Sequence, residues 1–226
     1  MSMYIYRGVN SLMQQLKRKL PGVDPAQYID FFCLRSWGVM NDRVVHDQIY
    51  VHDKVLIVDD RVAIVGSANI NDRSMLGERD TEMALRIEDT LHETISLGGG
   101  PFVVGKTVHD MRVRFMRQHT GAPTADVDNM TSVDTYEWQW RNIAASNASL
   151  YDQLDGEASP YRCKTVTAYT NGLRNLINKS SRDPQVQNIV NSIKGFLVLW
   201  PMELFIKDDI APSAATNVLI PTNLWV

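Results

Sequence analysis

Two apolar segments separated by a short polar turn constrain the fold of this chain more than any other feature. The first, residues 49–58, ends in the run VLIV; an Asp-Asp-Arg turn follows at 59–61, and residues 62–65 (VAIV) are again apolar. Apolar, β-branched runs with a polar break between them predict two strands joined by a turn. Because few polar side chains interrupt the runs, we expect both faces of these strands to be covered.

Helical and strand patterns alternate along the rest of the chain, which predicts the α/β class with a mixed sheet sandwiched between helices. The predicted helices cover residues 10–20, 70–77, 104–119, 133–154 and 165–179, and further strands cover residues 28–36, 81–88 and 195–200. The run GGGP at 98–101 predicts a hinge, after which the composition shifts toward helix. Arg112, Arg114 and Arg117 lie on the third of these helices, and we expect them to be exposed to solvent.

Composition excludes several classes of protein. The 226 residues can bury a core without disulfides, and Cys33 and Cys163 are the only cysteines, which favours a reducing compartment. Lys and Arg total 23 against 26 Asp and Glu, a net charge of −3, so a nucleic-acid partner is not favoured. The first residues contain no signal peptide, and no apolar stretch is long enough to cross a bilayer. If this protein meets lipid, we expect it to do so from the water side.

The polar residues around the two central strands form a spaced motif. His52 and Lys54 are two residues apart on a predicted strand, so their side chains are expected on the same face. The second strand ends at Gly66, and Ser67 and Asn69 follow with short polar side chains. An imidazole, an ammonium, a hydroxyl and an amide gathered at one place suit a tetrahedral phosphoryl group.

These residue types also suit phosphodiester chemistry. A neutral imidazole attacks phosphorus well near pH 7, and a protonated imidazole is a good acid for the departing oxygen. An ammonium and neutral donors hold the non-bridging oxygens as negative charge builds. The sequence contains no Asp, Glu and His cluster at metal-ligand spacing, so we expect neither a metal nor another cofactor.

The motif resembles the HKD signature of the phospholipase D superfamily, in which Asp59 is the third signature residue. The resemblance is to the C-terminal catalytic lobe of eukaryotic phosphatidylcholine-hydrolysing members. It extends beyond the motif to residues 28–37, 49–51, 66–77, 79–82 and 195–226, and is weakest over 120–190.

The resemblance implies a role for each matching residue. His52 corresponds to the general acid that protonates the departing group. Lys54, Ser67 and Asn69 correspond to phosphate-binding positions, and Glu82 to a carboxylate that accepts a hydrogen bond from the histidine and orients it. Asp59 belongs to the catalytic motif, but its position at the end of a strand favours a structural role over a chemical one.

Asp53 stands where the family often has a small residue. Because it alternates with His52 and Lys54 on a predicted strand, its side chain is expected to face away from the site.

The resemblance also implies how the chain is organised. Residues 1–120 are expected to form the HKD-bearing α-β-α lobe. Residues 121–226 are expected to form a helical extension with a final strand and a C-terminal tail that packs back on the same lobe. The activity implied is hydrolysis of phosphatidylcholine to phosphatidic acid and choline, with alcohols as alternative acceptors, by a cytoplasmic protein that is peripheral on membranes.

One motif is half of what this chemistry needs, because one histidine attacks while another protonates. Three interpretations therefore stay open. The chain is the C-terminal lobe of a two-motif phospholipase D and pairs with an N-terminal lobe; or it is a homodimeric single-motif phosphodiesterase or nuclease, with His52 from each copy; or it is a non-catalytic fragment that binds phosphoryl lipid. Each is compatible with a phospholipid substrate at a membrane surface.

Overall fold

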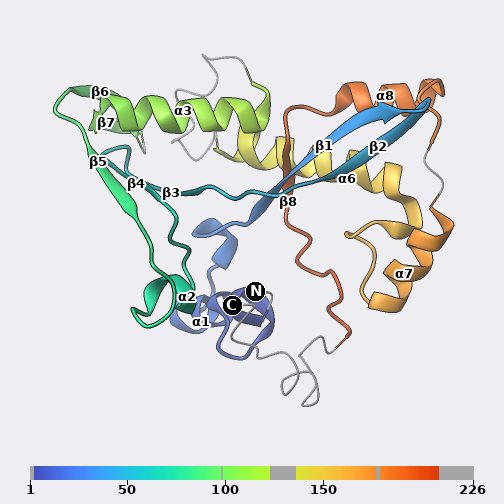
Figure 1. Ribbon diagram of the computed structural model, residues 1–226, viewed down its shortest axis with the longest axis horizontal. Helices are drawn as coiled ribbons and strands as arrows, with labels where there is room; N and C mark the ends of the chain where they lie inside the picture. The colour runs from blue at the N-terminus through green and yellow to red at the C-terminus, as the bar shows by residue number, and fades with distance from the viewer. Residues whose placement is uncertain (1–2, 98, 123–135, 177–178, 209–226) are drawn as a thin grey trace.

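The computed structural model describes residues 3–97, 99–122, 136–176 and 179–208, and it confirms the α/β class (Figure 1). The strands are β1 (Phe32–Met40), β2 (Arg43–Ile49), β3 (Lys54–Val58), β4 (Val62–Gly66), β5 (Ala84–Glu88), β6 (His92–Leu97), β7 (Gly100–Gly105) and β8 (Leu197–Leu199). The helices are η1 (Met3–Arg7), α1 (Leu12–Lys19), η2 (Pro25–Gln27), α2 (Asp72–Met75), α3 (Lys106–Thr120), η3 (Tyr136–Arg141), α6 (Asn142–Asp155), η4 (Gly156–Ala158), α7 (Val166–Asn175) and α8 (Pro184–Ser192).

The described strands form small antiparallel sheets in place of one mixed sheet. Their orders are β2-β1-β8, β3-β4-β5 and β6-β7. The cause is local: turns of two residues between β1 and β2 and of three residues between β3 and β4 join neighbours that must run antiparallel. Asn41 and Asp42 form the turn between β1 and β2, and Asp59 and Asp60 lie in the turn between β3 and β4, all with positive φ between 51° and 59°.

Several predicted boundaries are wrong, mostly where a hairpin was not recognised. The strand predicted at 49–58 begins only at Lys54, because β2 ends at Ile49 and residues 50–53 pair with no strand. The predicted hinge at 98–101 lies where β6 and β7 form a hairpin, with Leu97 opposite Gly100. The sequence patterns also missed β2 and α8.

The main core joins the two halves of the chain. Helices α6 and α8 pack on the β2-β1-β8 sheet, and β8 pairs with β1, with Cys33 opposite Val198. The buried cluster consists of Val44, Tyr151, Leu154, Val186, Val190 and Val198.

The division of the chain into a lobe and an extension at residues 120 and 121 stays a prediction. The expected docking of the C-terminal tail lies outside the described residues.

A close approach of two glycines connects α3 to this core. Gly121 ends α3 in the left-handed conformation, with φ of 65°. A Cβ atom there would lie 2.7 Å from the backbone nitrogen of Gly195, so only glycine permits the contact. Next to it, the Phe196 amide donates to the carbonyl of His119 at 2.8 Å.

Asp60 connects the β3-β4 turn to α3 through a buried ion pair. Its carboxylate accepts hydrogen bonds from Arg112 Nε at 2.6 Å and from His109 Nδ1 at 2.8 Å. The Asp60 side chain is 3% exposed and that of Arg112 is 11% exposed. The expectation that Arg112 is solvent exposed is therefore wrong, because its partner lies on a turn that is distant in sequence.

The apolar strands β3 and β4 are covered on one face only within the described residues. Ala63 is buried and Val55 and Ile57 are half-buried, whereas Leu56 is 49% exposed and Ile64 38% exposed. The prediction that both faces are covered is wrong for the chain by itself. None of the described helices combines the length and the apolar character that crossing a membrane requires.

We predict that Asp60→Asn lowers the free energy of unfolding by about 3 kcal/mol, because it leaves the buried Arg112 guanidinium without its countercharge. Asp59→Asn removes the same charge from the neighbouring exposed position, where φ is also positive, and should stay within about 0.5 kcal/mol of wild type. Urea denaturation of both variants checks this, and equal effects would contradict it.

Candidate active site

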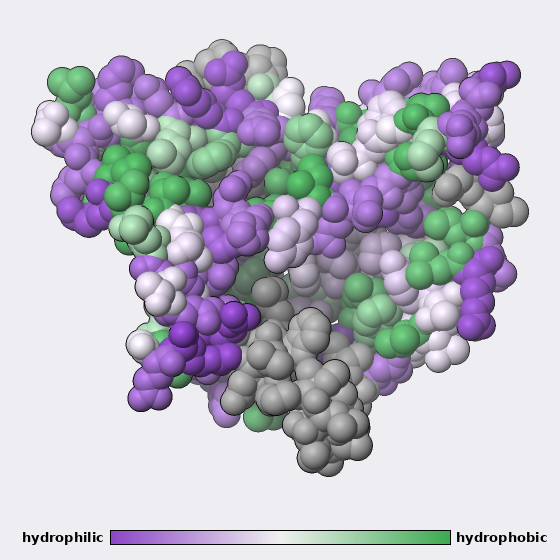
Figure 2. Space-filling model, in the orientation of Figure 1, coloured by the Kyte–Doolittle hydropathy of each residue, from purple (hydrophilic) through white to green (hydrophobic). Residues whose placement is uncertain are grey.

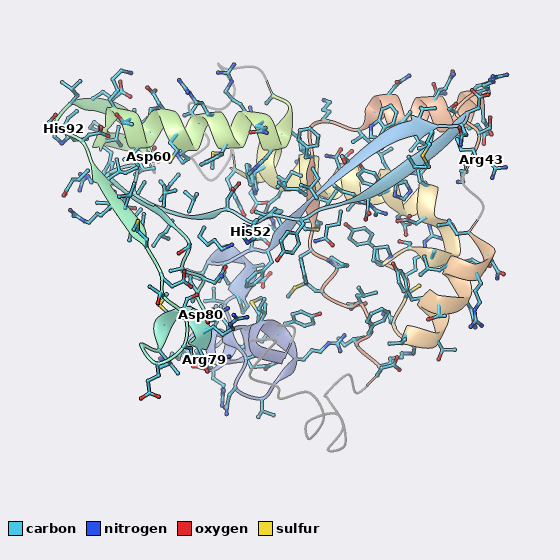
Figure 3. All side chains as sticks on the ribbon, in the orientation of Figure 1. Arg43, His52, Asp60, Arg79, Asp80 and His92 are labelled. Atoms are coloured by element: carbon cyan, nitrogen blue, oxygen red, sulfur yellow. The ribbon has the colours of Figure 1, made fainter. Side chains whose placement is uncertain are left out.

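The candidate site lies at the edge of the β3-β4-β5 sheet where three chain segments meet. Lys54, the first residue of β3, pairs with Gly66, the last residue of β4, and Gly66 pairs with Ala84, the first residue of β5. Antiparallel pairing thus places the segment before β3, the loop after β4 and the segment before β5 side by side. Figure 3 shows His52 on the first of these segments, and Asp80 and Arg79 below it beside α2.

Between these segments is an open pocket of about 570 Å³. It is lined by His52, Asp53, Lys54, Val55, Val65, Gly66, Ser67, Asn69, Asn71, Arg73, Asp80 and Glu82. The structure therefore brings together five of the six residues that the sequence pointed to. Asp59 is not among them, because it lies in the turn at the other end of the β3-β4 hairpin.

His52 is placed by its neighbours rather than by a strand. It lies in the unpaired segment before β3, its carbonyl accepts a hydrogen bond from Lys54 Nζ at 2.6 Å, and its ring stacks on Tyr50 with centroids 6.0 Å apart. The prediction that His52 lies on a strand is wrong, so strict alternation does not apply, and Asp53 also lines the pocket. The structure nevertheless places His52 and Lys54 in one pocket.

Gly66 makes the site possible by letting two backbones approach closely. A Cβ atom at this position would lie 2.3 Å from the carbonyl oxygen of Met83. Because no side chain intervenes, the Ser67 amide donates to that carbonyl at 2.9 Å, and the Met83 amide donates to Ser67 Oγ at 3.1 Å. The glycine of the motif is therefore required by packing.

Glu82 is the centre of a hydrogen-bond network within the loop that follows β4. One carboxylate oxygen accepts from Ser67 Oγ and the other from Ser74 Oγ, the latter at 2.6 Å. Ser74 Oγ in turn accepts from the Asn69 amide at 3.0 Å. The hydrogen bonds from Ser67, and then those from Ser74, lower the pKa of the Glu82 carboxyl below its ordinary value.

This network changes what each predicted residue can do. Among the described residues, the side-chain hydrogen bonds found for Glu82 go to two serines and none to His52, so the orienting role of Glu82 on the histidine stays a prediction. The Ser67 proton is engaged by Glu82, whereas no partner is found within the described residues for the Asn69 side-chain amide. Asn69 is thus a neutral donor that lines the pocket without a competing side-chain contact among the described residues.

The pocket contains cationic groups beside the carboxylates of Asp53, Asp80 and Glu82. Lys54 and Arg73 both line it, and Arg73 pairs with Asp80 at 2.9 Å, as expected for two residues near loop ends. The described residues contain no group of three or more His, Cys, Asp or Glu arranged to hold a metal ion. The donors present are suited to binding a phosphoryl group directly.

Sequence reasoning missed two residues that shape this site. Ser74 bonds both Glu82 and the Asn69 backbone, and Tyr50 stacks on His52 with its ring 84% exposed. Tyr50 lies two residues before the histidine, but only the bend of the unpaired segment before β3 brings the two rings together. The partners of Ser74 are as far as eight residues away, so spacing does not reveal them.

Comparison with known proteins places these residues in a wider context. The sequence model of the family described as Phospholipase D matches residues 34–157. The chain is 35% identical over 229 residues to Phospholipase D1 of Homo sapiens. The matched region covers 97% of this chain and 21% of that protein. It is 34% identical over 212 residues to Phospholipase D B of Dictyostelium discoideum, covering 91% of this chain and 17% of the relative.

A plant relative gives the same result. The chain is 32% identical over 234 residues to Phospholipase D zeta 1 of Arabidopsis thaliana, covering 92% of this chain and 21% of that protein. The chain thus spans about a fifth of the length of the curated relatives it matches.

We predict that Glu82→Gln loosens the loop between β4 and α2, because an amide nitrogen cannot accept the second serine hydrogen bond. Amide hydrogen exchange at Asn69 and Met83 should become faster, whereas Glu78→Gln, at an exposed position outside the network, should change neither. Because the pKa of Glu82 is lowered in the folded state, the wild-type network should persist down through the ordinary Glu range. It should be lost only as the pH falls below that lowered pKa. Unchanged exchange in Glu82→Gln would contradict the role of the network.

Proposed function

Because the chain belongs to the phospholipase D family, we propose that it supplies one HKD half-site for phosphodiester hydrolysis. The observation that carries this proposal is the single pocket lined by His52, Lys54 and Asn69. It offers an imidazole, a fixed cation and a neutral donor to one phosphoryl group. The substrate we propose is phosphatidylcholine, which would be converted to phosphatidic acid and choline.

In the proposed reaction, His52 is the general acid. A histidine of a second lobe attacks phosphorus, the bond to the choline oxygen breaks, and His52 gives its proton to that oxygen. The neutral His52 then takes a proton from water, whose oxygen displaces the histidine and releases phosphatidic acid. An alcohol can replace water in this second step, which yields a transphosphatidylation product.

The phosphate would be held chiefly by Lys54 and Asn69. Lys54 Nζ already bonds the His52 carbonyl, so the cation is kept beside the reacting atoms. Ser67 reaches a phosphate oxygen as a donor only when its hydroxyl proton leaves Glu82. We therefore assign Ser67 and Glu82 to shaping the loop first, and give Ser67 a direct phosphate contact only in the substrate complex.

The exposed apolar surface around the pocket supports a second lobe as partner. Large apolar side chains stand open next to the site, including Ile70 at 91%, Met83 at 77% and Leu85 at 66% exposure. Figure 2 shows further apolar side chains gathered over the β3-β4-β5 sheet, below α3. An apolar surface of this kind marks an interaction site in a protein that stays in solution. We propose that an N-terminal HKD lobe, or a second copy of this chain, covers it.

We also propose that the protein works in the cytoplasm as a peripheral protein on membranes. Cys33 and Cys163 are both unpaired, which is the state expected in a reducing compartment. The proposed substrate lies in a bilayer, so the protein must reach a membrane surface to act on it.

The source of the second half-site can be tested by mixing lobes. We expect the purified chain to release no choline from phosphatidylcholine vesicles by itself, and to release it after addition of an N-terminal HKD lobe from a relative. Full activity of the isolated chain, with dimers in sedimentation, would favour the homodimer instead. Metal-independent degradation of single-stranded DNA without choline release would contradict the lipid assignment.

In the two-lobe enzyme, we predict that His52→Asn abolishes choline release while the thermal unfolding profile stays unchanged. His92→Asn, on the exposed strand β6, is the matched control and should retain wild-type activity. Glu82→Gln should lower the rate but leave vesicle binding intact. A wild-type rate in His52→Asn would remove the general acid from the mechanism.

The two-step route predicts a second product in ethanol. Phosphatidylethanol should form at the expense of phosphatidic acid, because the alcohol competes with water for the phosphohistidine. Mass spectrometry of the lipid products measures the ratio. Hydrolysis with no phosphatidylethanol at any ethanol concentration would contradict a covalent intermediate that is open to solvent.

A further inference from the structure

A second cavity, of about 680 Å³, lies between β6 and one face of α3. It shares no lining residue with the HKD pocket, which is at the opposite end of the β3-β4 hairpin from the Asp60 turn. Figure 3 shows this region near the labels of His92 and Asp60, with His52 well below and to the right. The proposed hydrolysis does not use this cavity.

The charged residues of this cavity are not balanced. Lys106 pairs with Asp110 at 3.3 Å and approaches Glu93 at 3.9 Å, so both lining carboxylates share one ammonium. Arg114 and Arg117 also line the cavity, and within the described residues neither has a carboxylate partner. Arg114 and Arg117 therefore give this cavity an excess of positive charge, although the net charge of the protein is negative.

The spacing of the two arginines places them side by side. Arg114 and Arg117 are three residues apart on α3, so their side chains leave the same face of the helix and repel each other. Two guanidinium groups that face one cavity can both donate to the oxygens of one phosphate, each through a pair of N–H groups. An anion between them would relieve the repulsion.

The inner wall of the cavity is fixed in place. His109 lines it with a side chain that is 9% exposed, and its Nδ1 is held by Asp60 at 2.8 Å. The other ring nitrogen, Nε2, faces the cavity side and lies 3.9 Å from Glu93 Oε1. Arg112 holds the same Asp60 at 2.6 Å, so the ring cannot turn freely. Glu93, on β6, forms part of the opposite wall.

We propose that the cavity between β6 and α3 binds a phosphate-bearing anion through Arg114 and Arg117. The volume exceeds that of one phosphate, which favours a group with more than one phosphate or with a polar body attached. The phosphate belongs either to a soluble metabolite or to a lipid headgroup.

Isothermal titration calorimetry tests the soluble source, with inorganic phosphate and inositol hexakisphosphate as probes at near-physiological ionic strength. Arg114→Gln/Arg117→Gln should weaken binding at least about tenfold. The lysine pair Arg114→Lys/Arg117→Lys should bind with intermediate affinity, because it keeps the charge but loses the paired donors.

A control variant separates this site from general charge. Lys17→Gln/Lys19→Gln removes the same charge from the exposed face of α1, and it should stay within about twofold of wild type for the hexakisphosphate.

Co-sedimentation tests the lipid source, using phosphatidylcholine vesicles with and without phosphatidic acid. Arginine-dependent binding to the anionic vesicles supports a headgroup, and arginine-dependent binding of the free probes supports a soluble phosphate. The proposal is overturned if the wild type binds no probe, if the Arg114/Arg117 glutamine variant binds like the wild type, or if the α1 control variant loses as much affinity.

Discussion

The register of the β3-β4-β5 sheet is the constraint on which the candidate site depends. Lys54 lies opposite Gly66, and Gly66 opposite Ala84, so segments from three separate parts of the chain end at one sheet edge. A shift of one residue would send Lys54 to the other face of the sheet. Gly66 enforces this register, because any side chain there would collide with the Met83 carbonyl. The chemistry of the pocket therefore rests on backbone pairing before it rests on any catalytic side chain.

The same hairpin is fixed at both of its ends by carboxylates. Glu82 gathers Ser67 and Ser74 at the site, and Asp60 gathers Arg112 and His109 at the turn. The first network is exposed and depends on neutral donors, whereas the second is buried and depends on an ion pair. Because α3 carries the partners of Asp60, a buried ion pair connects the hairpin that holds the HKD pocket to the helix that forms the second cavity. One face of the β3-β4 hairpin stays exposed within the described residues.

Sequence reasoning succeeded where spacing alone carries the information, and failed where a contact joins distant segments. The spacing of His52, Lys54 and Asn69 predicted that their side chains gather at one place, and the three residues do line one pocket, although the strand expected to hold His52 begins two residues later. The composition of the helix that carries Arg112 suggested that this arginine is exposed to solvent. That prediction failed because the partner of Arg112 is Asp60, which is 52 residues away in the sequence. Asp59 and Asp60 are neighbours with the same side chain, and nothing in the sequence says that Asp60 is the buried one.

The sequence by itself determined the α/β class, the family and the residue types gathered in the pocket, because the fixed spacing of the motif is a local property of the chain. Tertiary structure decided which of those groups are free to act. Ser67 has the residue type of a donor, yet its hydroxyl donates to Glu82. Asn69 lines the pocket, and its side-chain amide has no partner within the described residues. Tertiary structure also decided that Arg114 and Arg117 share a cavity while Arg112 is buried. The physical reason is that hydrogen bonds and ion pairs are set by which segments lie beside each other in space, and that depends on the register of the sheets and the packing of α3.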